Sequence, residues 1–242
     1  MLSVVLAAAL AVGLEWLGNI GAQQASLAWL QYARRGVGLI NGLSYAAFIL
    51  ALLELIEKRR QIRRDARALG YKLLPEDVGT VIDKAYVPKI FSHLKGLPKE
   101  IQETRLAKLV EICATKYQTS NSVSEVSETM RTQLELEFNH LETSYSLIRY
   151  LVWAIPVLGF IGTVVGLSDA LRFFGQTGEE WLGRITSSLA MAFDTTFVAL
   201  VLAFLLTYVY HRVEREDEDL LNRISDYSLR NFIVRAYFPP TR

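Results

Sequence analysis

The sequence predicts an all-α polytopic membrane protein with about four transmembrane helices and long helical cytoplasmic extensions. Hydrophobic residues make up 51% of the 242 residues, and they gather in long runs while the charged residues occupy separate blocks. A helix needs roughly 20 apolar residues to cross a bilayer, and four runs approach or exceed that length. The polar stretches between them repeat apolar residues at helical spacing, which predicts helices that continue into water.

Residues 1–56 hold the first two predicted membrane segments. The first runs from about Leu2 to Gly18 and is the weakest, because roughly 17 residues would have to tilt or thin the bilayer to span it. It lacks the positively charged start of a signal peptide, so we expect a segment that is not cleaved. The second runs from about Val37 to Ile56 and is expected to continue as a helix through the following basic residues to Gly70.

Residues 148–210 hold the other two predicted segments, which form an antiparallel helix pair. The third runs from about Ile148 to Phe174 and the fourth from about Ile185 to Tyr210. Their connection, GQTGEEWLG, is short and acidic and suits the outer side of the membrane. The charged residues 211–242 are expected to form a helical cytoplasmic tail.

The basic residues predict that both termini and most of the soluble part are cytoplasmic. EKRRQIRRDAR follows the second segment and HRVER follows the fourth, and basic clusters beside membrane helices stay on the cytoplasmic side. Arg34 and Arg35 oppose this orientation, because they would lie outside, before the second segment. The two other clusters are much larger, so we expect them to decide the orientation.

Residues 57–147 predict a helical cytoplasmic region. Pro75, followed by acidic residues, marks a helix start in LPEDVGTVIDKAY, and Ser122–Glu125 has the capping-box pattern. After that pattern neither proline nor glycine occurs until Pro156. One helix is therefore expected from Ser124 into the third membrane segment.

Both helices of the pair carry a stripe of small residues. Lipid provides little hydrophobic drive between helices, so small residues at an interface let the two backbones approach closely. We expect the third and fourth segments to pack through these stripes. The residues concerned are Gly159, Gly162 and Gly166 on the third segment and Ala192, Ala199 and Ala203 on the fourth.

Two threonines are expected at nearly the same height in this pair. Thr163 follows the start of the third segment by about 15 residues and Thr196 precedes the end of the fourth by about 14, so both lie about 22 Å from the cytoplasmic end. Thr195 is one position away. Such a cluster of hydroxyls could solvate a passing ion or a partner's carboxylate. Alternatively, each hydroxyl bonds a carbonyl one turn back on its own helix.

Two aspartates interrupt the apolar runs. Ionisable groups in a membrane span are costly, and they face a cavity, a bundle interior or the interface. Asp169 lies near the outer end of its segment, where an interfacial carboxylate is the simpler interpretation. Asp194 lies deeper in the sequence of its segment and is a candidate for helix packing or for the ion path.

The stretch PVLGFIGTVVGLSDAL, followed by SSLAMAFDTTFVALVLAF, resembles the MotA/TolQ/ExbB proton-channel family. The resemblance covers residues 150–210 and rests on a glycine-flanked threonine, matched by Thr163, and a threonine in an alanine-rich helix, matched by Thr196. Met191 stands where many ExbB-like and TolQ-like members have a glutamate, and Ala199 stands where the family usually has glycine. The soluble region between the second and third of four segments is closer to the flagellar-stator branch, MotA.

The resemblance implies a homopentamer around a central pore in the bacterial inner membrane. The pore would hold a dimer of a single-span partner similar to MotB, TolR or ExbD, and the ion-carrying aspartate would belong to that partner. This chain would be the A-type channel or stator subunit, whose threonine hydroxyls face the ion path and act by hydrogen bonding, because they do not titrate. The flow of H⁺ or Na⁺ would drive mechanical work, and no cofactor is implied.

A membrane scaffold or sensor with a helical partner-binding module is the alternative, which explains the small stripes but not the matched threonines. An enzyme is not expected, since His93, His140 and His211 lack metal-ligand spacing and no nucleophile motif or phosphate loop is present. Cys113 is the single cysteine, which excludes a Cys-rich metal site. The basic run from Lys58 to Arg67 is interpreted as a topology signal in contact with lipid headgroups, and no nucleic-acid partner is expected.

Overall fold

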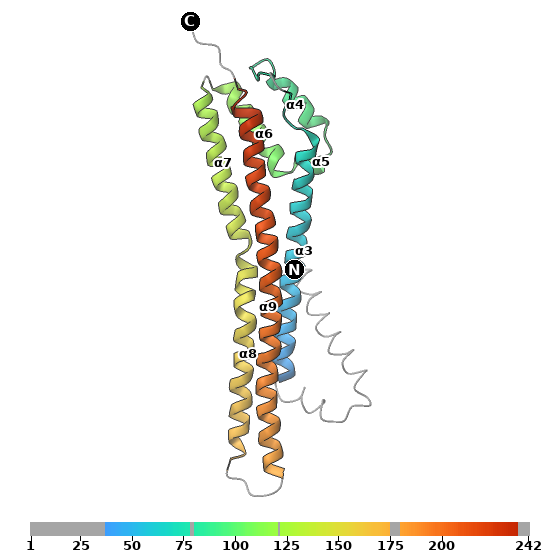
Figure 1. The fold of residues 1–242 in the computed structure, drawn as a ribbon, viewed down its shortest axis with the longest axis vertical. Helices are drawn as coiled ribbons and strands as arrows, with labels where there is room; N and C mark the ends of the chain where they lie inside the picture. Colours follow the sequence, from blue (N-terminus) through green and yellow to red (C-terminus); the bar gives the residue numbers. More distant parts are fainter. Residues whose placement is uncertain (1–36, 78–79, 121, 175–179, 237–242) are drawn as a thin grey trace. The chain divides into compact units, whose positions relative to one another are not determined.

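A computed structural model describes residues 37–77, 80–120, 122–174 and 180–236. In these ranges the chain is helical, and the one β pairing is an isolated bridge between Ile82 and Ala236. The predicted all-α class is therefore confirmed (Figure 1). Within the described residues, 3 helices are long and apolar enough to cross a membrane, and they contain the second, third and fourth predicted segments. The first segment, about Leu2 to Gly18, lies outside the described residues, as do Arg34 and Arg35, so the total of about four stays a prediction.

The chain divides into two compact units. Unit 1 consists of residues 1–56 and 146–211, and unit 2 of residues 57–145 and 212–242, each as far as the structure describes them. Two long helices contribute residues to both units, so the division does not follow helix ends.

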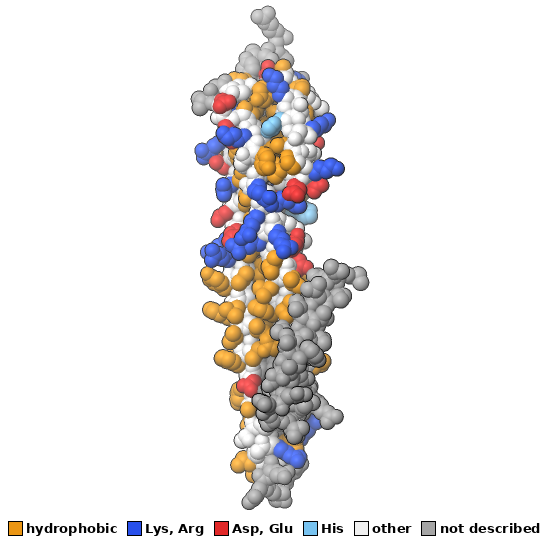
Figure 2. Space-filling view, turned by 90° about the vertical axis from the view of Figure 1, so that its right-hand side faces the viewer, with side chains coloured by type: hydrophobic (Ala, Val, Ile, Leu, Met, Phe, Trp, Pro, Cys, Tyr) orange, Lys and Arg blue, Asp and Glu red, His pale blue; other side chains and the backbone are white. Residues whose placement is uncertain are grey.

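Three long helices supply unit 1: α3 (Val37–Ala68), α8 (Ser146–Arg172) and α9 (Glu180–Ser228). As predicted, the second segment continues without a break through the basic residues, and α3 ends close to the expected Gly70. Only 22%, 28% and 33% of the apolar windows in the three candidate spans are buried inside the chain. Figure 2 shows hydrophobic side chains exposed along the helices of unit 1, and this surface requires cover by lipid or by other chains.

Unit 2 is built from shorter helices around a core of its own. Tyr117 and Phe232 pack edge to face with ring centroids 6.0 Å apart, and the Tyr117 hydroxyl donates to the Ile82 carbonyl at 2.8 Å. Besides parts of α3 and α9, the helical elements are η1 (Leu69–Tyr71), α4 (Val87–Gly96), α5 (Lys99–Gln102), α6 (Arg105–Thr119), α7 (Val123–Ser144) and the π-helical turn η2 (Leu229–Ile233).

The predicted helix start at Pro75 is wrong. The described part of residues 72–86 is not helical. The Arg235 guanidinium donates to the carbonyls of Glu76 and Asp77 at 3.0 and 2.6 Å. These bonds from the far end of the chain satisfy carbonyls that a helix would otherwise use. The local spacing of apolar residues could not predict bonds to so distant a residue.

Helix α7 begins where the capping pattern predicts, but the bonds of a capping box do not form. Ser122 is the N-cap residue, yet its side chain makes no cap hydrogen bond, and its N–H donates to Ser120 Oγ at 3.1 Å. Glu125 pairs instead with Lys116 at 2.9 Å, and the hydrogen bond from that ammonium lowers the pKa of Glu125. The capping pattern was therefore sufficient to predict where α7 begins, but not that Glu125 pairs with Lys116.

The single helix predicted from Ser124 to Ile155 is interrupted at one residue. Helix α7 ends at Ser144 and α8 begins at Ser146, while Tyr145 between them has φ −94° and ψ 0°. Ser144 Oγ donates to the Leu141 carbonyl at 2.8 Å. In a regular helix the Tyr145 N–H would bond that same carbonyl, whereas here it bonds the Thr143 carbonyl.

Candidate functional site

Helices α8 and α9 pack through the small residues that the sequence singles out. The three glycines of α8 are buried, and a side chain at any of them would meet α9 too closely. Ala203, further along α9, is also buried. The facing pairs are Gly159 with Ala199, Gly162 with Thr195, and Gly166 with Ala192. A Cβ added at Gly159 would lie 2.5 Å from the Ala199 Cβ, and one added at Gly166 would lie 2.7 Å from the Ala192 Cβ.

Thr163 of α8 and Thr196 of α9 lie side by side, and their hydroxyls hydrogen-bond to each other. Thr196 Oγ1 donates across the interface to the Gly159 carbonyl at 2.8 Å. Thr163 Oγ1 also lies 3.3 Å from the Ala192 carbonyl and 3.4 Å from that of Gly159. The two hydroxyls therefore link the helices, and they are not confined to bonds within their own helix.

The bonding of this pair limits what it can offer a ligand. A threonine hydroxyl has one proton and two lone pairs. Either hydroxyl can donate to the other, and the one that accepts donates its own proton to a nearby carbonyl of Gly159 or Ala192. Both protons are then engaged, and the groups left over are oxygen lone pairs. Such a pair can help to solvate a cation or accept a hydrogen bond from a protonated carboxyl group.

The other candidate residues occupy different positions. Thr195 is buried, and its hydroxyl donates to a carbonyl of its own helix at 2.9 Å. Asp169 Oδ2 accepts from Ser188 Oγ at 2.9 Å, which links α8 to α9. Asp194 is exposed on α9, whereas Met191, one turn earlier, is buried. The structure therefore brings Thr163 and Thr196 together, and it places Asp194 off the glycine-lined interface.

Unit 2 contains a buried ion cluster that the sequence did not reveal. Arg105 Nε donates to Asp65 Oδ2 at 2.8 Å, and Arg105 Nη2 donates to Asp217 Oδ1 at 2.6 Å. The Tyr145 hydroxyl donates to the second oxygen of Asp217 at 3.2 Å. Asp65 is 5% exposed and Asp217 is 2% exposed. The two carboxylates lie 40 and 112 residues from Arg105, so no local pattern could indicate the cluster.

Burial and charge set the protonation of this cluster. Burial raises the pKa of Asp65 above its ordinary value, although Arg105 opposes the shift. Burial alone would lower the pKa of Arg105, but the charges and hydrogen bonds of Asp217 and Asp65 outweigh it, so the pKa rises. Burial and the charge of Asp217 also raise the pKa of Tyr145. Arg105 thus stays a cation, and Tyr145 stays a hydrogen-bond donor.

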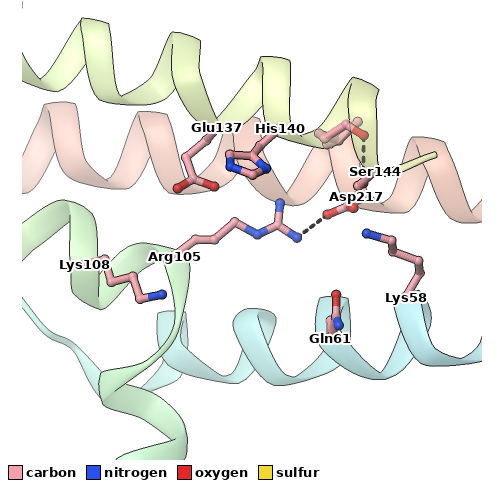
Figure 3. Close-up of a pocket in the computed structure, with 9 residues that line it drawn as sticks. Lys58, Gln61, Arg105, Lys108, Glu137, His140, Ser144 and Asp217 are labelled. Atoms are coloured by element: carbon pink, nitrogen blue, oxygen red, sulfur yellow. Dashed lines mark hydrogen bonds and ion pairs between the residues drawn. The ribbon is translucent and has the colours of Figure 1, made fainter. Parts of the chain in front are cut away.

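A cleft of about 250 Å³ lies beside the cluster within unit 2. Figure 3 shows Lys58 and Gln61 on α3, Lys108 on α6 and His140 on α7 around this space. Lys58 Nζ also lies 5.4 Å from the centroid of the Tyr145 ring. Three cations (Lys58, Arg105 and Lys108) and two carboxylates (Glu137 and Asp217) line the cleft, so its formal charge is only slightly positive.

The described residues contain no group of three or more His, Cys, Asp or Glu side chains that could hold a metal ion. Cys113 is buried in unit 2, and burial raises the pKa of its thiol to about 12. It is therefore a protonated, unreactive thiol at neutral pH.

Comparison with known proteins identifies the family. The model of the MotA/TolQ/ExbB proton channel family matches residues 97–226, which is more than half of the chain and includes all of α8 and all but the last two residues of α9. The chain belongs to this family. The family resemblance in the sequence is thereby confirmed, and family membership agrees with helices that can span a membrane.

The chain is also similar to a curated protein. An ExbB homologue from Methanothermobacter thermautotrophicus, named as a biopolymer transport protein, is 23% identical over 190 residues. The matched region is 78% of this chain and 64% of the relative. The chain therefore spans a little less than two thirds of that protein's length.

Proposed function

We propose that this chain is the A-type subunit of a proton or sodium channel that converts ion-motive force into mechanical work. In the proposed complex, a pentamer surrounds a dimer of a single-span partner of the MotB, TolR or ExbD kind. The complex lies in the cytoplasmic membrane, with unit 2 and both termini in the cytoplasm. The proposal rests on family membership together with the geometry of α8 and α9.

The observation that carries the proposal is the pair formed by Thr163 and Thr196. Two hydroxyls meet across the glycine-lined interface of two apolar helices, with oxygen lone pairs left over. A partner aspartate in its protonated form can donate to such oxygens, and a sodium ion can be partly solvated by them. One charge that crosses the membrane provides about 2.3 kcal/mol per 100 mV, so a few ions per step suffice for work.

The exposed apolar surface of the two helices supports assembly into an oligomer. Only 28% and 33% of the apolar windows in the spans that contain α8 and α9 are buried within one chain. Large side chains such as Phe160, Phe197 and Phe204 are more than half exposed. We therefore expect a pentamer, measured by native mass spectrometry of the detergent-solubilised chain. A stable monomer under these conditions contradicts this part of the proposal.

Replacing Thr163 or Thr196 by valine is expected to reduce ion flux while leaving assembly intact. Valine keeps the shape of threonine but removes the hydroxyl, and a hydrogen bond in a membrane is worth about 0.6–2 kcal/mol. If the bond acts on the rate-limiting step, flux falls about 3- to 30-fold. Serine restores the hydroxyl and should rescue flux better than valine. The measurement is proton or sodium flux in cells that also express the partner, with a pull-down for assembly.

Thr207 provides the matched control for this experiment. Its hydroxyl donates to the Ala203 carbonyl of its own helix at 2.7 Å, so Thr207→Val removes a local bond and should leave flux unchanged. Normal flux in both Thr163→Val and Thr196→Val would remove the pair from the mechanism. In that case close packing alone explains the interface, as it would in a membrane scaffold.

A further inference from the structure

A second cleft within unit 2, which we call the basic cleft, lies between the segment that follows η1 and helix α4. Its volume is about 270 Å³, and Lys72, Lys89 and His93 line it. No carboxylate is among the described residues that form its lining. The charge of the basic cleft therefore favours an anion, unlike that of the cleft beside Arg105.

The core of unit 2 holds the floor of the basic cleft in place. Leu73, Leu74 and Ile90 all line the cleft, and each is only 2% exposed. The Leu74 N–H donates to the Tyr227 hydroxyl of α9 at 3.2 Å, which ties the segment after η1 to that helix. The cleft is therefore formed before any ligand enters, and a preformed site has less order to gain on binding.

Helix α4 presents two of the basic side chains on one face. Lys89 and His93 lie four residues apart in this helix, so they are neighbours on its surface. Lys89 Nζ lies 5.4 Å from the centroid of the Tyr86 ring, which also lines the cleft. This contact positions the ammonium and leaves it N–H groups to donate. His93 has at least one N–H donor in either protonation state.

Lys72 lines the cleft from the other element and has an unusual backbone conformation. Its φ is 49° and its ψ is 56°, and within the described residues no other non-glycine residue has a positive φ. Glycine would adopt this left-handed conformation without steric cost, so a lysine here points to a use for its side chain. Its ammonium pairs with Glu76 at 3.0 Å, but the two side chains are 71% and 36% exposed. Such an exposed pair is weak, so the ammonium can turn to a ligand.

We propose that the basic cleft binds the phosphate group of a small soluble molecule. A phosphate ester carries a charge of about −1.5 to −2 at pH 7 and offers three acceptor oxygens. Two ammonium groups match this charge, and the His93 N–H adds a donor for a further oxygen. Lysine is a common phosphate ligand that acts as a point charge. The inference does not rest on the proposed function, because no residue of the α8–α9 pair takes part.

The length of α3 favours a soluble source of the phosphate over a lipid headgroup. The predicted second membrane segment ends at about Ile56, and residues 57–71 are helical as the end of α3 and as η1. Lys72 is therefore about 20 Å further along the chain. The headgroup layer on one side of a bilayer is only roughly 5–8 Å deep.

Titration of inorganic phosphate with the full chain in detergent, followed by the ³¹P NMR line width, tests the site. The broadening should saturate with the unchanged protein. Lys72→Gln and Lys89→Gln should each weaken phosphate binding about 2- to 5-fold, the effect of one exposed ion pair. The double variant should weaken it about 5- to 20-fold. Lys95→Gln is the matched control, because Lys95 is also an exposed lysine of α4 but does not line the cleft. It should leave the titration unchanged.

The basic cleft is not a phosphate site if the broadening does not saturate. It is also not one if Lys95→Gln weakens binding as much as Lys89→Gln, since general surface charge then explains the effect. The same titration in nanodiscs of phosphatidylcholine and of phosphatidylglycerol distinguishes the two sources of phosphate. Equal binding in both nanodiscs supports a soluble ligand. Loss of binding in phosphatidylglycerol alone shows that a lipid headgroup occupies the cleft, and it overturns the soluble source.

Discussion

Replacing Arg105 by methionine is expected to lower the free energy of local unfolding of unit 2 by about 3–5 kcal/mol, since it leaves two buried carboxylates without their cation. Asp65 and Asp217 are both nearly inaccessible, and Arg105 bonds to each of them within 2.8 Å. Hydrogen exchange of the α6 amides in the full chain, in detergent, measures this loss as faster opening.

The loss should depend on pH in a direction that the pKa of Asp65 sets. Burial already raises that pKa, and Arg105 opposes the rise, so removing Arg105 raises the pKa further. The folded chain then binds a proton more readily than the unfolded chain between the two pKa values, and stability falls as pH rises through that window. The deficit of Arg105→Met should therefore be larger at about pH 7.5 than at about pH 5, after correction for intrinsic exchange rates.

The exposed pair of Arg59 and Glu216 provides a matched control. It lies on the same helices, α3 and α9, at 3.4 Å, with side chains 45% and 36% exposed. Exposed pairs of this kind contribute about 0–1 kcal/mol, so Arg59→Met should have little effect at either pH. Equal losses of stability in Arg59→Met and Arg105→Met would show that the burial of the Arg105 cluster does not determine its contribution to the stability of unit 2.

The sequence was sufficient for features that depend on local spacing. Long apolar runs predicted the positions of the described spans, because length and hydropathy alone decide whether a helix can cross a bilayer. The stripe of Gly159, Gly162 and Gly166 pointed to a close interface, and a depth count placed Thr163 level with Thr196. These inferences follow from helical geometry and the 1.5 Å rise per residue, which need no knowledge of distant parts of the chain.

Features that depend on distant residues could not be predicted in this way. Arg105 finds Asp217 across 112 residues, and Arg235 takes backbone carbonyls near Pro75 that local propensity had assigned to a helix. The break at Tyr145 was not predictable either, because serine, which precedes it as Ser144, is common in polar helices and usually harmless. At Pro75 tertiary contacts overrode the local pattern.

Replacing Gly162 by alanine is expected to destabilise the α8–α9 pair and to abolish the contact between the two threonines. The added methyl group would overlap the Thr195 side chain, whose Cβ lies 2.7 Å from the position it would occupy. Overpacking of this kind costs about 1–3 kcal/mol. Helix propensity acts in the opposite direction, because alanine is favoured over glycine by about 1 kcal/mol in a helix. A net loss of stability in Gly162→Ala therefore reflects poorer packing between α8 and α9, and not a weaker helix.

Gly183→Ala separates these two effects, since a Cβ added at Gly183 of α9 meets nothing within 4 Å. It should be neutral or slightly stabilising in thermal melting of the full chain in detergent, while Gly162→Ala should melt at a lower temperature and lose ion flux. Moving the side chain across the interface, as Gly162→Ala with Thr195→Gly, should recover part of the stability because the overlapping atoms are gone. If Gly162→Ala melts together with Gly183→Ala, the helices can separate at no cost, and the close approach at Gly162 does not hold the two threonines in place.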